Sequence, residues 1–340
     1  MRTMEEIKRT KNEYGGFLPL ELNPGNEYFT DYEHCLSRYN TVKAALDELV
    51  GRLGCDRIFI PYYYCPSTKE AIKKTGIDVR FYHINDKLLP MDLPDESNSI
   101  VLLVDYFGIC GDKVKEIAKT LENAEVIFDF AHDFFEKPVI EEHRHNIYSA
   151  KKFFGVPDGA YLISKTMLPN IVSPSFASGY SEYLIKTYEE GTNAAYLMKK
   201  EVDKKLADNY GSMSMLAMGL LMNFYYDSTM YQSIKNYIAL REAVNAFNEM
   251  DLPESCAAYQ FPLLIKEKGR ALKKILIENK VFVSTLWTGE ELKNNGNDYE
   301  IGMMKDCVFL PMDQRYSEED MRYISGLIEK SVRCLMYEDT

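Results

Sequence analysis

The chain has 340 residues, of which 46% are hydrophobic and 27% are charged. This composition is typical of a folded protein with one large or two modest domains, and it excludes a disordered or fibrous chain. The net charge of −12 disfavours nucleic-acid and anionic-membrane partners, because both present phosphate groups that an acidic surface repels.

The N-terminal segment MRTMEEIKRTKNEY alternates charges and lacks the apolar run of a signal peptide. No later stretch approaches the ~20 apolar residues of a membrane span. Seven cysteines are scattered without a CxxC spacing, which argues against a zinc site or a disulfide framework. We therefore expect a cytoplasmic protein with reduced thiols and no membrane segment.

The first half of the chain alternates between helical and strand-like patterns. Apolar residues at helical spacing predict helices over residues 41–53, 67–76 and 113–124. Short apolar runs predict strands over residues 57–61, 79–84, 99–108, 125–131 and 146–149. Strands that alternate with helices indicate an α/β fold with a mainly parallel sheet covered on both faces.

The second half begins with two long helical patterns, over residues 183–210 and 213–250. We interpret the methionines of the second pattern as core packing rather than a ligand groove. Alternation then returns, with strands predicted over 259–266, 281–287 and 306–312 and helices over 269–280 and 317–335. The change from alternating elements to long helices and back predicts two domains. The large domain covers residues 20–245, and the small α/β domain covers residues 246–340 together with the N-terminal arm, residues 1–19.

The strand-like stretch VIFDFAHDFF places a carboxylate, Asp129, and an imidazole, His132, at the end of an apolar run. Buried charge is costly unless it meets a partner. In parallel sheets the carboxyl ends of the strands form the ligand crevice. Two other strands end in PYYY and DYFG, so three strand ends present aromatic or acidic groups toward one edge.

A partner for Asp129 is suggested by residues 148–161, YSAKKFFGVPDGAY, which follow the next predicted strand. A lysine that points into the crevice would be desolvated, its pKa would fall, and it would be an imine-forming nucleophile; the alternative is two solvated turn lysines. Pyridoxal phosphate (PLP) requires three kinds of group: a carboxylate at a strand end, a lysine, and hydroxyls at a helix start. Its pyridine nitrogen would pair with Asp129. Helix-start groups at Asn40 and Thr41, with Ser149, could bind its phosphate.

These elements resemble the fold-type I PLP-dependent aminotransferases, and within them the DegT/DnrJ/StrS group that aminates keto sugars. The specific part is the pair DFAH and SAKKFFGVPDG in this order, and it is supported by YNTVKAAL, IFIPYYYC, VDYFG and LPMDQRY. The resemblance implies a three-layer PLP-transferase fold with a mainly parallel central sheet and a smaller C-terminal α/β domain.

The resemblance also implies three catalytic residues. Asp129 matches the residue that pairs with the pyridine nitrogen, and His132 the one beside the ring or its oxygen. Lys152 matches the Schiff-base lysine and is preferred to Lys151, because Gly159 stands seven residues after it, where the family has the first glycine of a pair. A lysine here argues against the dehydratase relatives, in which a histidine replaces it.

The remaining site residues are implied in the same way. Tyr63 or Tyr64 would stack on the cofactor ring, and Tyr106 would face the substrate. Asn40, Thr41 and Val42 stand where the family has Ser-Gly-Thr, and with Ser149 they would bind the phosphate. Arg38 and Arg315 are candidates for binding a carboxylate or phosphate of the substrate, although an ion pair is the simpler interpretation of each.

The expected function is transfer of an amino group from an amino acid, glutamate in the first place, to a keto acceptor, a nucleotide-linked keto sugar. Such enzymes build their sites at the interface of a homodimer, and residues 173–183 are the candidate loop that closes the partner's site. Two alternatives stay open: another PLP reaction, such as that of a lyase, decarboxylase or aldolase, and a non-catalytic protein of the same fold. A metal hydrolase is disfavoured because no third ligand accompanies His143 and His145, so we expect no metal site.

Overall fold

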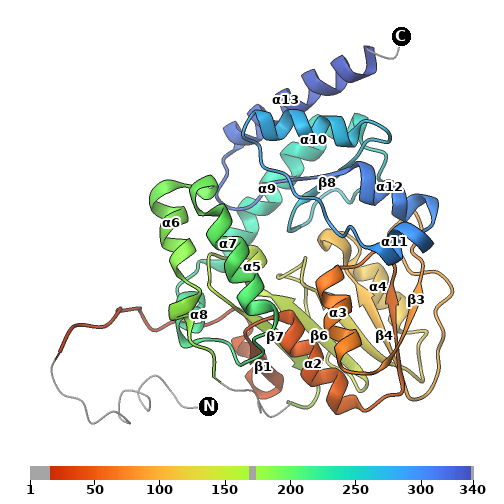
Figure 1. Ribbon diagram of the computed structural model, residues 1–340, viewed down its shortest axis with the longest axis vertical. Coiled ribbons are helices and arrows are strands. Elements are labelled where there is room, and N and C mark those ends of the chain that lie inside the picture. Colours follow the sequence, from red (N-terminus) through yellow and green to blue (C-terminus); the bar gives the residue numbers. More distant parts are fainter. Residues whose placement is uncertain (1–15, 168–173, 338–340) are drawn as a thin grey trace.

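The computed structural model describes residues 16–167 and 174–337, and its centre is a seven-stranded sheet (Figure 1). The strand order is β1-β7-β6-β5-β4-β2-β3. Strands β6, β5, β4, β2 and β3 are parallel, whereas β7 is antiparallel to β6 and to β1. The bounds are β1 Leu36–Tyr39, β2 Arg57–Pro61, β3 Asp78–Tyr82, β4 Ser99–Val104, β5 Glu125–Phe130, β6 Arg144–Ser149 and β7 Ala160–Ser164. The prediction of a mainly parallel α/β sheet is confirmed.

Helices pack on this sheet as the apolar patterns require. All six residues of β4 are buried between β2 and β5, as expected for a central parallel strand. Helix α2 contacts β1, β6 and β7, while α4 contacts β4. The helices of the first half are α2 Val42–Leu53, α3 Pro66–Lys74, α4 Gly111–Ala118 and α5 Ala150–Phe153.

A second, two-stranded antiparallel sheet of β8 Phe261–Leu264 and β9 Cys307–Leu310 lies in the C-terminal part of the chain. Helix α13 packs against both α9 and α10, in the blue and teal region of Figure 1. The remaining helices are α6 Glu182–Glu190, α7 Thr192–Ala207, α8 Met215–Leu221, α9 Tyr226–Val244, α10 Gly269–Glu278, α11 Glu290–Asn295, α12 Asp298–Asp306 and α13 Glu318–Tyr337.

Several predicted boundaries are wrong. The long pattern over residues 183–210 is divided into α6 and α7 by Gly191, whose φ of 89° ends a helix. Residues 281–287 form no strand: a single bridge joins Ser284 to Phe309, and Trp287 adopts a positive φ of 61°. Strands β1 and β7 and helices α11 and α12 were not predicted.

Among residues 16–167 and 174–337, no helix has the length and apolarity needed to cross a bilayer.

The start of α10 packs so closely on the end of α12 that only glycine fits there. A Cβ atom at Gly269 would lie 1.8 Å from the carbonyl oxygen of Asp306. We expect Gly269→Ala to destabilise the protein by about 1–3 kcal/mol or more, because the α12–β9 junction must move to admit a methyl group. Urea unfolding at equilibrium measures this change.

The matched control is Gly326→Ala, in an exposed part of α13 where a Cβ atom meets nothing within 4 Å. This control should gain about 0.5–1 kcal/mol, because alanine favours a helix interior. Equal unfolding midpoints for the two variants would contradict the close contact at Gly269.

Candidate active site

A cavity of about 570 Å³ lies at the carboxyl ends of β4, β5 and β6, where α2 and α3 begin. It collects residues that are far apart in the sequence. Of the predicted site residues, the structure places in its lining Thr41, Val42, Tyr64, Asp129, His132, Ser149 and Lys152.

Asp129 is the carboxylate at the base of this cavity. It occupies β5 and is 6% exposed. The Tyr64 hydroxyl donates to Asp129 Oδ2 at 2.5 Å, and the Ala131 amide donates to Oδ1 at 2.9 Å. Burial raises the pKa of Asp129, although these two hydrogen bonds and the charge of Lys152 act in the opposite direction. The carboxylate is therefore oriented by neutral donors and lacks a cation in direct contact among the described residues.

Lys152 and His132 face each other across the same cavity. The short helix α5 follows β6 directly and brings Lys152 Nζ to 2.9 Å from His132 Nε2. The same nitrogen lies 4.7 Å from the centre of the Tyr259 ring. Burial, followed by the positive charge of Lys152, lowers the pKa of His132 well below its ordinary value, so the ring is neutral.

A neutral imidazole carries one proton, on either Nδ1 or Nε2, and the contact of His132 with Lys152 bears on which nitrogen holds it. When Lys152 carries its ammonium proton it can only donate, so His132 Nε2 then accepts and the ring proton is on Nδ1. Nδ1 is buried and has no hydrogen-bond partner in the described part of the chain. A buried donor without an acceptor is unfavourable, and a ligand oxygen in this cavity would satisfy it.

The two adjacent lysines differ in their surroundings. Lys151 also lines the cavity, but its Nζ lies 3.3 Å from Asp203 Oδ1 on α7, and burial lowers its pKa. The structure thus places Lys152, and not Lys151, beside His132 and near Asp129.

The start of α2 forms another wall of the cavity. Thr41 caps the helix, and its hydroxyl accepts from the Ala44 amide at 3.1 Å. The first amide that donates within the helix is that of Ala45, to the Thr41 carbonyl, so the amides of Val42 and Lys43 have no intrahelical acceptor and can bind a ligand. Helix N-terminal amides favour anions, and the Lys43 side chain adds a positive charge to the same wall.

Three predicted residues are not brought into the cavity lining. Asn40 is fully buried, and its side-chain amide donates to Ser175 Oγ at 3.0 Å and to the Asn209 carbonyl at 2.6 Å.

Tyr106 donates its hydroxyl to the backbone carbonyl of Tyr63 at 2.7 Å, and both rings are buried in the core. Of the two tyrosines considered for ring stacking, only Tyr64 lines the cavity.

The two candidate arginines form ion pairs elsewhere. Arg38 binds Glu27 and Glu33, each at 2.5 Å, and Arg315 binds Asp313 at 2.7 Å. Neither lines the cavity, so the ion-pair interpretation holds for both.

The histidines of the HRH sequence both contact one carboxylate, which the sequence did not predict. His143 Nδ1 and His145 Nε2 lie 2.8 and 3.0 Å from the two oxygens of Glu125. Glu125 begins β5, so this group lies at the opposite end of the strand from Asp129.

Sequence reasoning missed the two aromatic residues that enclose the cavity. Trp287 stacks on His132 with ring centres 5.3 Å apart and planes 12° apart, and Tyr259 lies 5.1 Å from the same ring. The one available signal was that Trp287 is the only tryptophan of the chain. Its approach to His132 depends on the fold, because 154 residues separate the two positions.

Comparison with known proteins gives similarity in structure alone. No protein-family model and no curated protein sequence matches the chain. A DegT DnrJ EryC1 StrS aminotransferase from Brucella abortus is 16% identical, with 87% of this chain and 85% of that chain covered and a TM-score of 0.59. A sugar aminotransferase from Micromonospora echinospora is 11% identical, with 87% of both chains covered and a TM-score of 0.61.

A third solved structure is GDP-4-keto-6-deoxymannose-3-dehydratase with a trapped PLP-glutamate geminal diamine. It is 14% identical, with 90% of this chain and 93% of that chain covered and a TM-score of 0.62. Similarity at such identities establishes the fold. The chain therefore has the PLP-transferase fold of the DegT/DnrJ/EryC1/StrS aminotransferases and of this related dehydratase.

Proposed function

We propose that this protein is a PLP-dependent aminotransferase that moves an amino group from glutamate to a keto acceptor, a nucleotide-linked keto sugar. The observation that carries the proposal is the meeting of Asp129, His132 and Lys152 in one cavity, with Lys152 Nζ 2.9 Å from the neutral imidazole. The solved structures of the same fold support the reaction class, because two of them are aminotransferases and the third holds a PLP-glutamate adduct.

The residues present fit the cofactor. Asp129 is buried and contacts no cation within the part of the chain that the structure describes, and a protonated pyridine nitrogen is a suitable partner for it. The unpartnered Nδ1 of His132 can donate to a ring oxygen. Thr41, Val42 and Ser149 line the wall where a helix N-terminus favours phosphate. A volume of about 570 Å³ also lies within the range of small-molecule sites.

The chemistry divides between the cofactor and the chain. Bound PLP supplies an electron-withdrawing ring that stabilises negative charge on a substrate carbon. Asp129 would keep the ring nitrogen protonated, and the Tyr64 hydroxyl holds that carboxylate in position. Lys152 would bind the cofactor aldehyde and, once displaced by the amino donor, carry the substrate proton on Nζ. His132 remains neutral, so it orients Lys152 without competing for that proton.

A dimer is part of the proposal. We expect residues 173–183 of one subunit to close the site of the other. Ser173 lies outside the described residues, but Phe176 is 77% exposed. An exposed phenylalanine in this loop is consistent with contact to a second copy.

The division into domains is also a proposal. We assign residues 20–245 to a large cofactor-binding domain and 246–340, with the arm 1–19, to a small one. The small domain would then supply Tyr259 and Trp287 to the cavity, which makes movement between the domains a means of enclosing the substrate.

Absorbance spectroscopy tests the proposed function. The purified protein is mixed with PLP, its visible spectrum is recorded, and L-glutamate is then added beside a panel of other amino acids. We expect a yellow band from lysine-bound cofactor, which bleaches with glutamate as the cofactor takes up the amino group. The Lys151→Ala variant should behave in the same way, because Lys151 contacts Asp203 instead of His132.

Two results would contradict the proposal. No cofactor-dependent band would refute PLP binding itself. A band that no amino donor bleaches would refute amino transfer and leave a lyase, a decarboxylase or a non-catalytic protein as the better explanation.

A further inference from the structure

The lining of the candidate active-site cavity is basic, although the chain as a whole has a net charge of −12. Among the described residues the lining holds three aspartates and five lysines: Asp105, Asp129, Asp203, Lys43, Lys151, Lys152, Lys199 and Lys204. The carboxyl group of Asp105 is hydrogen-bonded to the Cys110 amide and to Asp133, so Asp129 and Asp203 remain to oppose the lysines. A concave wall with an excess of positive charge attracts anionic ligands.

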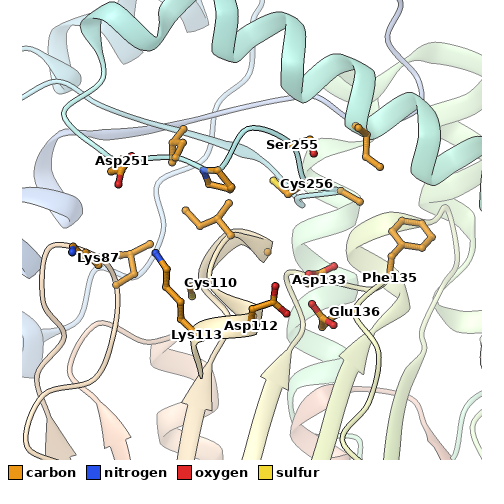
Figure 2. Close-up of a pocket in the computed structure, with 18 of the residues that line it drawn as sticks. Lys87, Cys110, Asp112, Lys113, Asp133, Phe135, Glu136, Asp251, Ser255 and Cys256 are labelled. Atoms are coloured by element: carbon orange, nitrogen blue, oxygen red, sulfur yellow. The ribbon is translucent and has the colours of Figure 1, made fainter. Parts of the chain in front are cut away.

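A second cavity, of about 600 Å³, has the opposite balance (Figure 2). Figure 2 shows Lys87 and Lys113 around the same hollow as Asp112, Asp133 and Asp251. Within the described parts of the chain, its lining contains three lysines and five carboxylates. This cavity follows the acidic character of the chain, so the basic lining of the candidate active site is a property of that site and not of every hollow in the protein.

Helix α7 supplies part of the positive charge. Lys199, Asp203 and Lys204 lie on this helix and line the candidate active-site cavity. Asp203 Oδ1 lies 3.3 Å from Lys151 Nζ of α5, and Asp203 Oδ2 lies 2.5 Å from Lys199 Nζ. One carboxylate therefore serves two lysines and joins α7 to α5. The proposed amino transfer assigns no role to Lys199 or Lys204.

Two lysines of the lining form no ion pair with any residue that the structure describes. Lys43 is half-buried on the first turn of α2, and Lys204 is exposed on α7. Burial lowers the pKa of Lys43, because its charged form is poorly solvated there. An anion that enters the cavity would compensate this cost.

The phosphate of PLP would not balance these lysines. In the proposed function Lys152 binds the aldehyde, and Asp129 pairs with the ring nitrogen. The other four lysines of the lining, when charged, and Asp203 leave three net positive charges. A phosphate monoester carries only about −1.5 to −2 at pH 7, and the amides at the start of α2 already favour it. Roughly one positive charge is therefore left for a second anionic group.

We propose that Lys43, Lys199 and Lys204 bind the phosphate groups of the acceptor substrate. This inference rests on the proposed function, because a nucleotide-linked keto sugar carries a phosphate or diphosphate beside its sugar. The phosphate of the cofactor would occupy the wall at the start of α2, and the phosphates of the acceptor the part of the cavity next to α7. The lysines of α7 would then select phosphorylated acceptors over free keto sugars.

Calorimetry with inorganic diphosphate tests this subsite without turnover. The protein is loaded with PLP, its visible band is recorded, and sodium diphosphate is added at several NaCl concentrations. We expect one saturable site per chain, whose affinity falls by about tenfold or more between about 0.05 and 0.5 M NaCl, because salt screens the lysine charges. The visible band reports PLP binding separately, so a failure of the proposed function is distinguishable from a failure of this inference.

Replacement of single lysines on α7 makes the test specific. Lys204→Met should weaken diphosphate binding by about tenfold, the effect of one hydrogen bond to a charged group. The matched control is Lys205→Met, which removes the same charge from the same turn of α7 at an exposed position outside the cavity lining. Its affinity for diphosphate should equal that of the unmodified chain. Both positions are exposed, so neither variant removes a buried contact.

The phosphate of the cofactor is the competing ligand for these lysines, and pyridoxal, which lacks that phosphate, distinguishes the two. If Lys204→Met weakened binding of PLP but not of pyridoxal, and diphosphate bound only to the PLP-free protein, the lysines would serve the cofactor and the proposal would be overturned. The absence of saturable heat, or equal losses of affinity in Lys204→Met and Lys205→Met, would overturn it as well, because the lysines of α7 would then be ordinary solvated side chains.

Discussion

Replacing Lys152 by alanine is expected to abolish covalent attachment of PLP and to lower the rate of amino transfer by on the order of 10³–10⁶-fold. The reason is positional, since Lys152 Nζ lies beside His132 in the cavity that Asp129 lines. Lys151→Ala should retain most of the activity, because its partner is Asp203 on α7. Single-turnover kinetics with glutamate, and mass spectrometry after borohydride reduction in the presence of PLP, measure both effects.

The comparison of the two adjacent lysines makes this test specific. Both variants lose one buried or half-buried positive charge, so a general loss of stability would affect them alike. If Lys151→Ala were the inactive variant, or if the reduced cofactor were found on Lys151, the assignment of roles within α5 would be wrong.

Replacing Asp129 by asparagine is expected to lower turnover by roughly 10²–10³-fold while the protein remains folded. Removing one member of a buried ion pair costs about 3–5 kcal/mol, and 1.4 kcal/mol corresponds to a factor of ten. Asparagine keeps one oxygen, which can accept from the Ala131 amide as Oδ1 does, while its NH₂ group takes the place of Oδ2 and can donate to the Tyr64 hydroxyl oxygen. Both contacts can therefore be kept, and the change mainly removes charge. The rate of cofactor bleaching by glutamate, at saturating PLP, measures the effect.

The control for this prediction is Tyr64→Phe, which removes one hydrogen bond from Asp129 but leaves its charge. Its loss should be about tenfold, the effect of a single hydrogen bond to a charged group. A loss in Asp129→Asn no greater than that in Tyr64→Phe would show that the charge of Asp129 is not what the reaction requires.

Local sequence patterns anticipated the parallel core of the sheet well. The apolar runs that became β4 and β5 are buried on both faces, so their composition alone distinguishes them from surface strands. Asp129 stood out because it interrupts such a run. Among the elements that were missed, β1 and β7 pair with each other although they are far apart in the sequence, and a local pattern does not reveal such pairing.

Trp287 illustrates why part of the site was not predicted. It lies in a stretch whose composition favours a strand, yet it adopts a positive φ and stacks on His132. The gain from packing an aromatic ring against several others exceeds the local preference of the chain for an extended conformation. The sequence around Trp287 does not reveal this packing, because the rings that Trp287 contacts come from distant segments of the chain.

The sequence by itself determined the chemical groups: a carboxylate at the end of a buried strand, an imidazole three residues later and a pair of lysines after the next strand. These are local features, since burial and strand ends follow from the apolar pattern. The tertiary structure decided which lysine contacts His132, and that Tyr64 and not Tyr63 reaches the cavity. Those outcomes depend on side-chain direction and on contacts between distant segments, which the packing of the whole sheet and its covering helices determines.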